Sequence, residues 1–438
     1  MTGVRGRHRA VRRPRVGARG TPHSGSTDLI PLPVEELRGL GRLEGDAAEV
    51  TGVEIDSRRV APGDLFVALA GGAAFLDEAR ARGAAATLVP TDDYAALAAI
   101  GSMVRARSTA RVVAITGSVG KTSTKDILAA LLRPHVRLIA AEAGFNNEVG
   151  LPLTLARIEP DTEVVVTEMG MRGAGQIRAL AAIARPDVGV ITAIAPAHLE
   201  QLGSVENVAR AKAELLDALP PGGIAVVPAD APALEPFIPP GLDVRRFEAP
   251  QVEVRDGRAC VSFGGREIAF SFTARHQAAN AVAALTVCEA LGVPLPGEVV
   301  DVAFSRWRSQ ESELPGGGLL LNDAWNANPV AMRAALAYLV ERADGRRTIA
   351  VLGEMAELGE NAAAYHDEIG RAANEVDLVI GVGELARRYE PGEWVATAAE
   401  AASLVRELVL PGDAVLVKGS RSVGLEVVAD ALAGVTAP

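Results

Sequence analysis

A glycine-rich turn that ends in a lysine is the clearest chemical signal in this chain of 438 residues. It reads Thr116-Gly117-Ser118-Val119-Gly120-Lys121-Thr122-Ser123 and lies between an apolar run and a helical pattern. Glycines allow a tight turn whose backbone N–H groups point at phosphate oxygens, and the N-terminus of the next helix adds partial positive charge. Lys121 would then contact the β- and γ-phosphates of a nucleotide, and the Thr122 hydroxyl would be a Mg²⁺ ligand. The longer Walker pattern requires glycine where this chain has Ile115, so the turn predicts a shorter T-G-x-x-G-K-T phosphate loop.

Two further polar residues follow apolar, strand-like runs. Glu168 comes directly after Val164–Thr167, and His198 lies just past Val188–Thr192. Doubly wound sheets bind their ligands at the carboxyl ends of strands, where a carboxylate suits Mg²⁺. Either residue alone is more often structural, but their matching places after neighbouring strands favour a shared site.

The elements that must position these residues alternate between strand and helix. Strands are predicted at Asp64–Leu69, Thr87–Val89, Arg111–Thr116, Val164–Thr167, Val188–Thr192, Ile224–Val227, Leu319–Asn322, Thr348–Leu352, Leu378–Gly381 and Ala414–Val417. Helices are predicted at Thr122–Leu132, Val205–Leu219, His276–Leu291, Val330–Arg342, Ala362–Asn374 and Ala398–Leu408. This alternation predicts an α/β fold, with parallel sheets covered by helices on both faces. The stretch Leu314–Gly318, which contains proline and glycines, is predicted to be the hinge before a second, smaller doubly wound unit.

Charge and composition exclude several function classes. The net charge is −11, but residues 1–27 hold seven arginines and no acidic residue, so the remainder carries −18 (−11 minus +7). A body this acidic repels phosphates, so non-specific binding of nucleic acid is not expected. The arginine-rich segment is predicted to be a disordered extension. No run of about 18 apolar residues predicts a membrane span, and two cysteines, Cys260 and Cys288, suit a reducing cytoplasm.

Several spaced motifs, taken together, resemble the Mur ligases, and among them the MurF type. They are Asp56-Ser57-Arg58, the phosphate loop, Asn146-Asn147-Glu148-Val149-Gly150-Leu151-Pro152, Glu168-Met169-Gly170, His198, Ala211-Lys212-Ala213-Glu214, His276 with Asn280, Asn322-Asp323-Ala324-Trp325-Asn326-Ala327-Asn328-Pro329, Val351-Leu352-Gly353-Glu354-Met355 and Lys418-Gly419-Ser420-Arg421. Each motif alone is weak, but their common order extends from about residue 50 to 430.

The resemblance implies a three-domain architecture and a reaction. After the 1–27 extension come an N-terminal UDP-sugar domain (28–109), a central P-loop ATPase domain (110–313) and a C-terminal Rossmann-like domain (314–438). The enzyme would be a monomer that uses ATP and two Mg²⁺ ions in the cytoplasm. It would phosphorylate the terminal carboxylate of UDP-N-acetylmuramoyl-tripeptide, and the amine of D-alanyl-D-alanine would attack the acyl phosphate, a step of peptidoglycan synthesis.

The resemblance also implies residue roles. Lys121, His198 and Lys212 would be catalytic, and Lys212 matches a carbamylated lysine of the family. ATP would contact Gly117, Ser118, Val119, Gly120, Lys121, Thr122, Ser123, Asn280, Arg308 and Asp323. The metal ions would be held by Thr122, Glu168, His198 and Lys212. The other substrates would contact Ser57, Asn146, Asn147, Asn326 and Asn328.

Other functions stay open on the sequence alone. A sister ligase of the diaminopimelate-adding type would carry an Asp-Asn-Pro-Arg box, which is absent. A folylpolyglutamate-type ligase lacks an N-terminal domain of the Asp56-Ser57-Arg58 kind. A non-catalytic homologue is the third alternative, because the Asp-Gly-His that usually follows the Phe66–Leu69 strand is missing. The retained polar residues, from Lys121 to Lys212, favour the enzyme.

Overall fold

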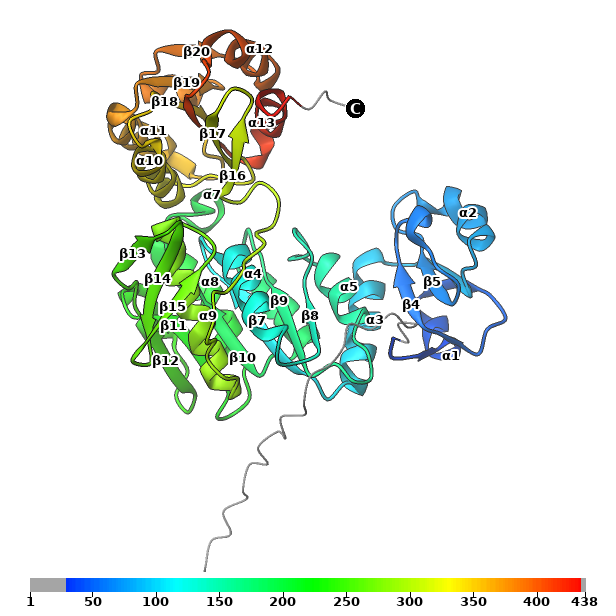
Figure 1. Cartoon of the computed structure of the whole chain (residues 1–438). Coiled ribbons are helices and arrows are strands. Elements are labelled where there is room, and N and C mark those ends of the chain that lie inside the picture. Colours follow the sequence, from blue (N-terminus) through cyan, green and yellow to red (C-terminus); the bar gives the residue numbers. More distant parts are fainter. Residues whose placement is uncertain (1–28, 435–438) are drawn as a thin grey trace, which may run out of the picture.

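Three successive stretches of the chain each build a sheet, as the computed structural model shows (Figure 1). The structure describes residues 29–434. The arginine-rich segment 1–27 therefore lies outside the described residues. Between residues 29 and 434, no helix is both long and apolar enough to cross a bilayer.

The first sheet is small and mixed. Its order is β2 (Gly41–Glu44), β6 (Ala86–Pro90), β5 (Asp64–Val67) and β4 (Gly52–Glu54), in which only β2 is antiparallel to its neighbour. A separate two-stranded pair joins β1 (Leu32–Pro33) to β3 (Glu49–Val50). The strands predicted at Asp64–Leu69 and Thr87–Val89 correspond to β5 and β6.

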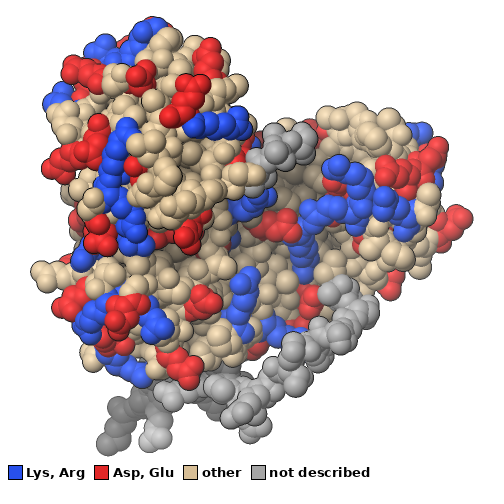
Figure 2. Space-filling model, turned by 45° about the horizontal axis from the view of Figure 1, so that its top comes forward, with Lys and Arg blue, Asp and Glu red and all other residues tan. Residues whose placement is uncertain are grey.

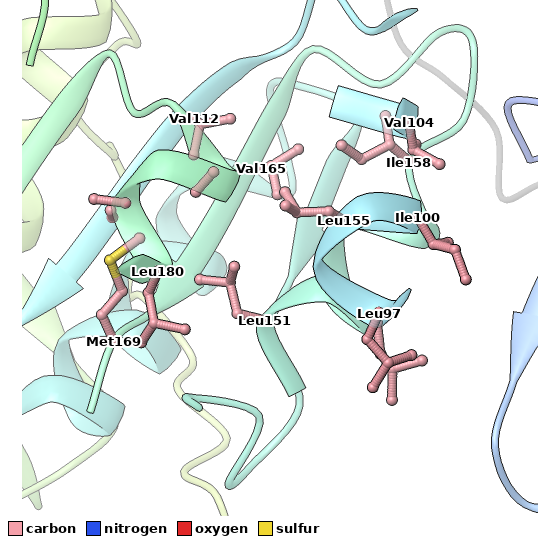
Figure 3. Packing of buried hydrophobic residues seen from close by; sticks show 14 of the residues in the cluster. Leu97, Ile100, Val104, Val112, Leu151, Leu155, Ile158, Val165, Met169 and Leu180 are labelled. Carbon is pink, nitrogen blue, oxygen red and sulfur yellow. The ribbon is translucent and has the colours of Figure 1, made fainter. Parts of the chain in front are cut away.

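Helix α3 (Asp93–Arg107) connects the first unit to the second through a shared core. Its side chains Leu97 and Ile100 lie near Leu151 of α5 (Gly150–Ala156) in one buried apolar cluster (Figure 3). The same cluster contains residues of the first sheet and of the central sheet. The two units are thus packed together rather than joined only by the chain.

The central sheet is parallel throughout. Its order is β12 (Asp243–Phe247), β11 (Ile224–Pro228), β10 (Val188–Ile191), β7 (Arg111–Thr116), β9 (Val164–Glu168) and β8 (Leu138–Ala140). In β7, Val112 and Ala114 belong to one buried cluster, whereas Val113 and Ile115 belong to another. Both faces are therefore buried, which explains why the strand is a continuous apolar run.

Helices cover both faces of this sheet, as predicted. α4 (Lys121–Leu132) and α9 (Ala278–Leu291) pack on the face of Val113. α6 (Gln176–Ala184) and α8 (Val205–Asp217) pack on the opposite face, together with α5.

A small antiparallel sheet was not predicted. It consists of β13 (Val252–Arg255), β14 (Arg258–Phe263) and β15 (Arg266–Phe270). Only alternate side chains of β14 and β15 are buried, such as Ala259 and Val261 in β14, and no side chain of β13 is. The strands therefore lack the continuous apolar runs that identify buried parallel strands.

The third sheet repeats the doubly wound pattern. Its order is β16 (Gln310–Leu314), β17 (Gly318–Asp323), β21 (Ala414–Lys418), β18 (Thr348–Gly353), β19 (Leu378–Val382) and β20 (Glu393–Val395). Only β16 is antiparallel. Its helices are α10 (Pro329–Ala343), α11 (Ala362–Ala372), α12 (Ala398–Leu408) and α13 (Glu426–Leu432).

The hinge predicted at Leu314–Gly318 is wrong. These residues form the turn between β16 and β17, closed by a 3.0 Å hydrogen bond from Gly317 N to Leu314 O. Gly316 and Gly317 have φ of +92° and +91°, a conformation that favours glycine. Glycine and proline mark hairpin turns as well as linkers, so composition alone could not separate the two.

The connection to the third sheet lies earlier in the chain, at residues 301–309. Asp126 of α4 holds it there, because its carboxylate accepts hydrogen bonds from Ser305 N (2.8 Å) and Ser305 Oγ (3.1 Å). Lys125 lies beside Asp126, with 2.5 Å between Nζ and Oδ1. Trp307 and Ser309 then adopt left-handed φ values of +61° and +45°.

Candidate active site

The phosphate loop lies between β7 and α4, as predicted. Gly120 precedes the first turn of α4 with φ +83°, and a Cβ added there would lie 2.2 Å from Asn280 Oδ1. Both the backbone angle and the close approach therefore require glycine. The Lys121 ammonium is folded back over the loop, where it donates a 2.9 Å hydrogen bond to Gly117 O.

Glu168 forms a buried junction beside this loop. Strand register pairs Ile115 with Glu168, which places the carboxylate next to the start of the loop. Its side chain is 1% exposed, and its two oxygens accept hydrogen bonds from Thr122 Oγ1 and Asn146 Nδ2, each 2.9 Å long. A carboxylate buried so deeply depends on such partners.

His198 follows β10 and lies at the N-terminal end of the short helix α7 (Leu199–Leu202), with a left-handed φ of +55°. Its Nδ1 contacts the carboxylate of Glu357, which comes from the third unit. Burial lowers the pKa of His198, and the hydrogen bond that Nδ1 donates to Glu357 partly opposes that shift.

Lys212 lies on α8 and is 1% exposed. Within residues 29–434 its ammonium makes no hydrogen bond or ion pair. Burial, and then the positive charge of Lys121, lower the pKa of Lys212 well below its usual value. The residue therefore favours a neutral amine, facing the same cleft as Lys121 and His198.

The start of α9 provides an amide and imidazole cluster. Asn280 Nδ2 donates to Gln277 Oε1 (2.6 Å), and Asn280 Oδ1 accepts from Thr124 Oγ1 (3.2 Å). His276 Nε2 lies 3.3 Å from the hydroxyl of Ser309. Asn280, His276 and Gln277 all line the cleft.

Arg308 lies between acidic groups of the two sheets. Burial lowers its pKa, and the carboxylates of Glu168 and Asp323 oppose that shift. Asp323 ends β17 and accepts hydrogen bonds from Lys418 Nζ (2.5 Å), at the end of β21, and from Ser309 N (3.2 Å). The carboxyl ends of the central and third sheets thus face each other across Arg308.

Two asparagines of the third unit are already engaged by the backbone. Asn328 Oδ1 caps α10 by accepting from Ala331 N at 2.9 Å, and Asn326 Oδ1 accepts from Ala327 N at 2.9 Å. Lys418 also donates to Asn326 O at 3.0 Å. These contacts fix the loop that follows β17.

One cleft of about 480 Å³ brings most of the predicted residues together. Those that line it are Ser118, Val119, Gly120, Lys121, Thr122, Ser123, Asn146, Asn147, Glu168, His198, Lys212, Asn280, Arg308, Asp323, Asn326 and Asn328. Gly117 does not line the cleft, but its carbonyl holds Lys121. Ser57 lies in the first unit, where its hydroxyl donates to Glu78 at 2.9 Å. The space-filling view shows basic and acidic side chains around the hollow between the first unit and the rest (Figure 2).

Sequence reasoning gave no role to three participants, although Trp325 and Lys418 stand in motifs that it singled out. Lys418 directly follows an apolar run, the same signal that identified Glu168. Trp325 lines the cleft and stacks on Trp307, with ring centroids 5.7 Å apart and Arg421 over both rings. Glu357 has no strand-end signal, because only the docking of two units brings it to His198.

Comparison with known proteins identifies the family. A family model described as the Mur ligase middle domain matches residues 115–288, and one described as the Mur ligase, glutamate ligase domain matches 307–421. A UDP-N-acetylmuramoyl-tripeptide–D-alanyl-D-alanine ligase of Mycobacterium leprae is 35% identical, over 93% of this chain and 98% of that protein. The chain belongs to the Mur ligase family.

Solved structures place it with the MurF type of Mur ligase. MurF of Acinetobacter baumannii has a TM-score of 0.79 and 26% identity, over 92% of this chain and 99% of that one. MurF of Thermotoga maritima, solved in complex with ADP, has a TM-score of 0.77 and 27% identity, over 88% and 97%. The predicted family and the predicted fold class, an α/β Mur ligase architecture, are both confirmed.

Proposed function

We propose that this Mur ligase uses ATP to join D-alanyl-D-alanine to UDP-N-acetylmuramoyl-tripeptide, the activity that its named relatives carry. One observation supports this best: Lys121, Glu168, Lys212 and the Asp323–Lys418 pair converge on a single cleft between two sheets. Peptidoglycan synthesis is therefore the process in which the protein acts.

The first step needs positive charge where a carboxylate meets a triphosphate. An oxygen of the tripeptide's terminal carboxylate attacks the γ-phosphorus, the bond to the β-phosphate oxygen breaks, and ADP leaves. The Lys121 ammonium would leave Gly117 O and contact the β- and γ-phosphates. Arg308 would contact the γ-phosphoryl group that is transferred. Because both cations are half-buried, their interaction with the phosphates is stronger than it would be in bulk water.

The second step joins the amine. The neutral amino nitrogen of D-alanyl-D-alanine attacks the carbonyl carbon of the acyl phosphate, the bond from that carbon to the phosphate oxygen breaks, and inorganic phosphate leaves while the nitrogen releases a proton. The third unit would help to position this substrate through Trp325, Asn326 and Asn328, which line the cleft opposite the phosphate loop. Asn146 and Asn147 line it from the central unit, and Ser57 would contact the UDP-sugar in the first unit.

The side chains of the cleft that could bind Mg²⁺ form a complete ligand set only together with nucleotide phosphates. Within residues 29–434 no group of three or more His, Cys, Asp or Glu could hold a metal ion by itself. Mg²⁺ is commonly bound by one or two carboxylates together with substrate phosphates and water. Thr122 and Glu168 would hold one ion, and His198 and Lys212 would help to hold a second. When bound, the ions would neutralise the charge that develops on the phosphoryl group.

Lys212 suits the second ion only as a carbamate. A neutral amine can add to CO₂ with release of a proton, which gives an N-carboxylate in place of an ammonium. Its burial without a hydrogen bond to any described residue, and the lowered pKa, both favour the neutral amine that this reaction requires. The product carboxylate would be the hard oxygen ligand that Mg²⁺ prefers.

The setting of the enzyme is part of the proposal. ATP and a UDP-linked precursor are cytoplasmic metabolites, and both cysteines are free. We propose that the enzyme acts in the cytoplasm as a monomer.

An assay of phosphate release tests the proposal. ATP and UDP-N-acetylmuramoyl-tripeptide are supplied with and without D-alanyl-D-alanine. The Lys121→Ala variant is the negative control. Release should depend on the dipeptide and fall by about 10²- to 10³-fold or more in the variant. A dipeptide-independent rate, or a variant within a few-fold of wild type, would refute the assignment.

A further inference from the structure

The contact between His198 and Glu357 joins two units of the molecule. His198 belongs to the central unit, whereas Glu357 lies in the loop after β18 of the third. Their backbones also meet, because Glu200 N donates to Glu357 O at 3.3 Å. Arg172 approaches the second carboxylate oxygen, with Nε 3.5 Å from Oε1.

Two hydrogen bonds within the third unit fix the loop that carries Glu357. Buried His366 accepts a hydrogen bond from Met355 N at 3.0 Å through its Nε2. Ser420 Oγ accepts from Ala356 N at 2.9 Å. Glu357 itself has a left-handed φ of +62°, a conformation that costs a non-glycine residue energy and persists only when its surroundings impose it.

The contact determines which imidazole nitrogen is free. A carboxylate accepts only, so Nδ1 of His198 must carry the proton that is shared with Glu357. The neutral ring then has an unprotonated Nε2. His198 lines the cleft and Glu357 does not, so Nδ1 is bound away from the cleft and Nε2 remains for a ligand.

We propose that Glu357 is a positioning residue that holds His198 in its metal-binding tautomer and ties that tautomer to the docked third unit. The inference rests on the proposed function, because it takes His198 as a metal ligand. Carboxylates that orient a ligating histidine are worth about 10- to 100-fold in metal affinity. Here the carboxylate belongs to a different unit, so the metal site is complete only when the third unit is docked.

The first test needs no turnover. Binding of Mn²⁺ with a non-hydrolysable ATP analogue is followed by electron paramagnetic resonance in the full chain. Glu357→Ala should weaken Mn²⁺ binding by about 10- to 100-fold. Glu357→Gln, which keeps an oxygen acceptor for Nδ1–H, should lose less. Glu360→Ala removes an exposed carboxylate from the 3-10 turn that follows this loop and should leave binding unchanged.

The second test reads the tautomer directly. Histidine ¹⁵N shifts of the metal-free protein, assigned with His198→Gln, should show Nδ1–H in wild type and a mixture in Glu357→Ala. Unchanged Mn²⁺ binding and an unchanged tautomer in Glu357→Ala would overturn the inference alone, provided that His198→Ala weakens binding. Unchanged Mn²⁺ binding in His198→Ala would instead overturn the metal-binding role that the proposed function gives to His198.

Discussion

Lys212 is the residue whose chemistry the environment constrains most. A buried amine beside Lys121 has its pKa lowered, and it suits Mg²⁺, which prefers oxygen ligands, only if it becomes a carboxylate. We expect Lys212→Ala to lose most activity and millimolar formate or acetate to restore part of it by occupying the vacated space. Steady-state rates with and without the added acid measure this.

Lys212→Arg is the matched comparison. Arginine keeps a positive charge but stays protonated and does not form a stable carbamate. We therefore expect it to be as inactive as the alanine variant and insensitive to carboxylic acids. Near-normal turnover in Lys212→Arg would contradict the carbamate and show that this side chain has only a structural role.

Burial of Lys212 should also lower the free energy of unfolding of the protein. At a pH between the lowered folded pKa and the usual value near 10.5, the unfolded chain binds a proton at Lys212 that the folded chain does not. Stability from this group therefore rises with pH, because the unfolded state binds more protons. In CO₂-free buffer Lys212→Met should raise Tm at pH 7, by roughly 2 to 4 °C for each kcal/mol gained.

The increase should shrink as the pH approaches 9.5, where the unfolded lysine begins to lose its proton. Differential scanning calorimetry at several pH values measures the trend. A difference in Tm that stays constant or grows with pH would contradict the sign of this argument.

At the scale of single elements, the turn before α4 offers a test of close approach. Gly120 and Gly175 both precede a helix with nearly equal φ, +83° and +84°. A Cβ at Gly175 meets nothing within 4 Å, whereas one at Gly120 would meet Asn280. Gly→Ala at either position should lower the free energy of unfolding by about 1 to 2 kcal/mol, because the backbone there is left-handed.

Only Gly120→Ala should also lose nucleotide affinity, because the added methyl displaces Asn280 or the loop. Titration calorimetry with ADP, together with Tm, separates the two effects. Equal losses of ADP affinity in both variants would show that the close contact with Asn280 is unimportant.

The elements also show what a sequence can reveal. Arg111–Thr116 and Ala398–Leu408 were predicted with the bounds that the structure has, because each is a strong apolar pattern between clear boundaries. Strand ends also predicted Glu168 and His198 as neighbours in one cleft. The amphipathic strands β13 to β15 and the contact with Glu357 were not predictable, since their burial depends on packing partners distant in sequence.

At the scale of the whole molecule, the shared core predicts how the protein unfolds. Residues of α3, the first sheet and the central sheet form one buried cluster, whereas the third sheet has clusters of its own. We therefore expect the first two units to unfold together. Leu97→Ala should cost about 2 to 5 kcal/mol and lower the transition of that joint unit.

Leu410→Ala is the control, because Leu410 is 56% exposed on the third unit and should leave both transitions nearly unchanged. Calorimetry of the two variants with wild type resolves the transitions. A separate early transition for the first unit in Leu97→Ala, with the central unit unaffected, would contradict a shared core.

The clamp of Asp126 on Ser305 has a consequence for how often the two halves of the cleft meet. Only residues 306–309 lie between that clamp and β16, and the five Cα–Cα steps from Ser305 to Gln310 reach at most about 18 Å when fully extended. The third unit therefore cannot diffuse away from the nucleotide site when it undocks. A short tether of this kind corresponds to an effective concentration in the millimolar range. Re-docking is thus an intramolecular event whose frequency is fixed by the tether and is independent of how dilute the enzyme is.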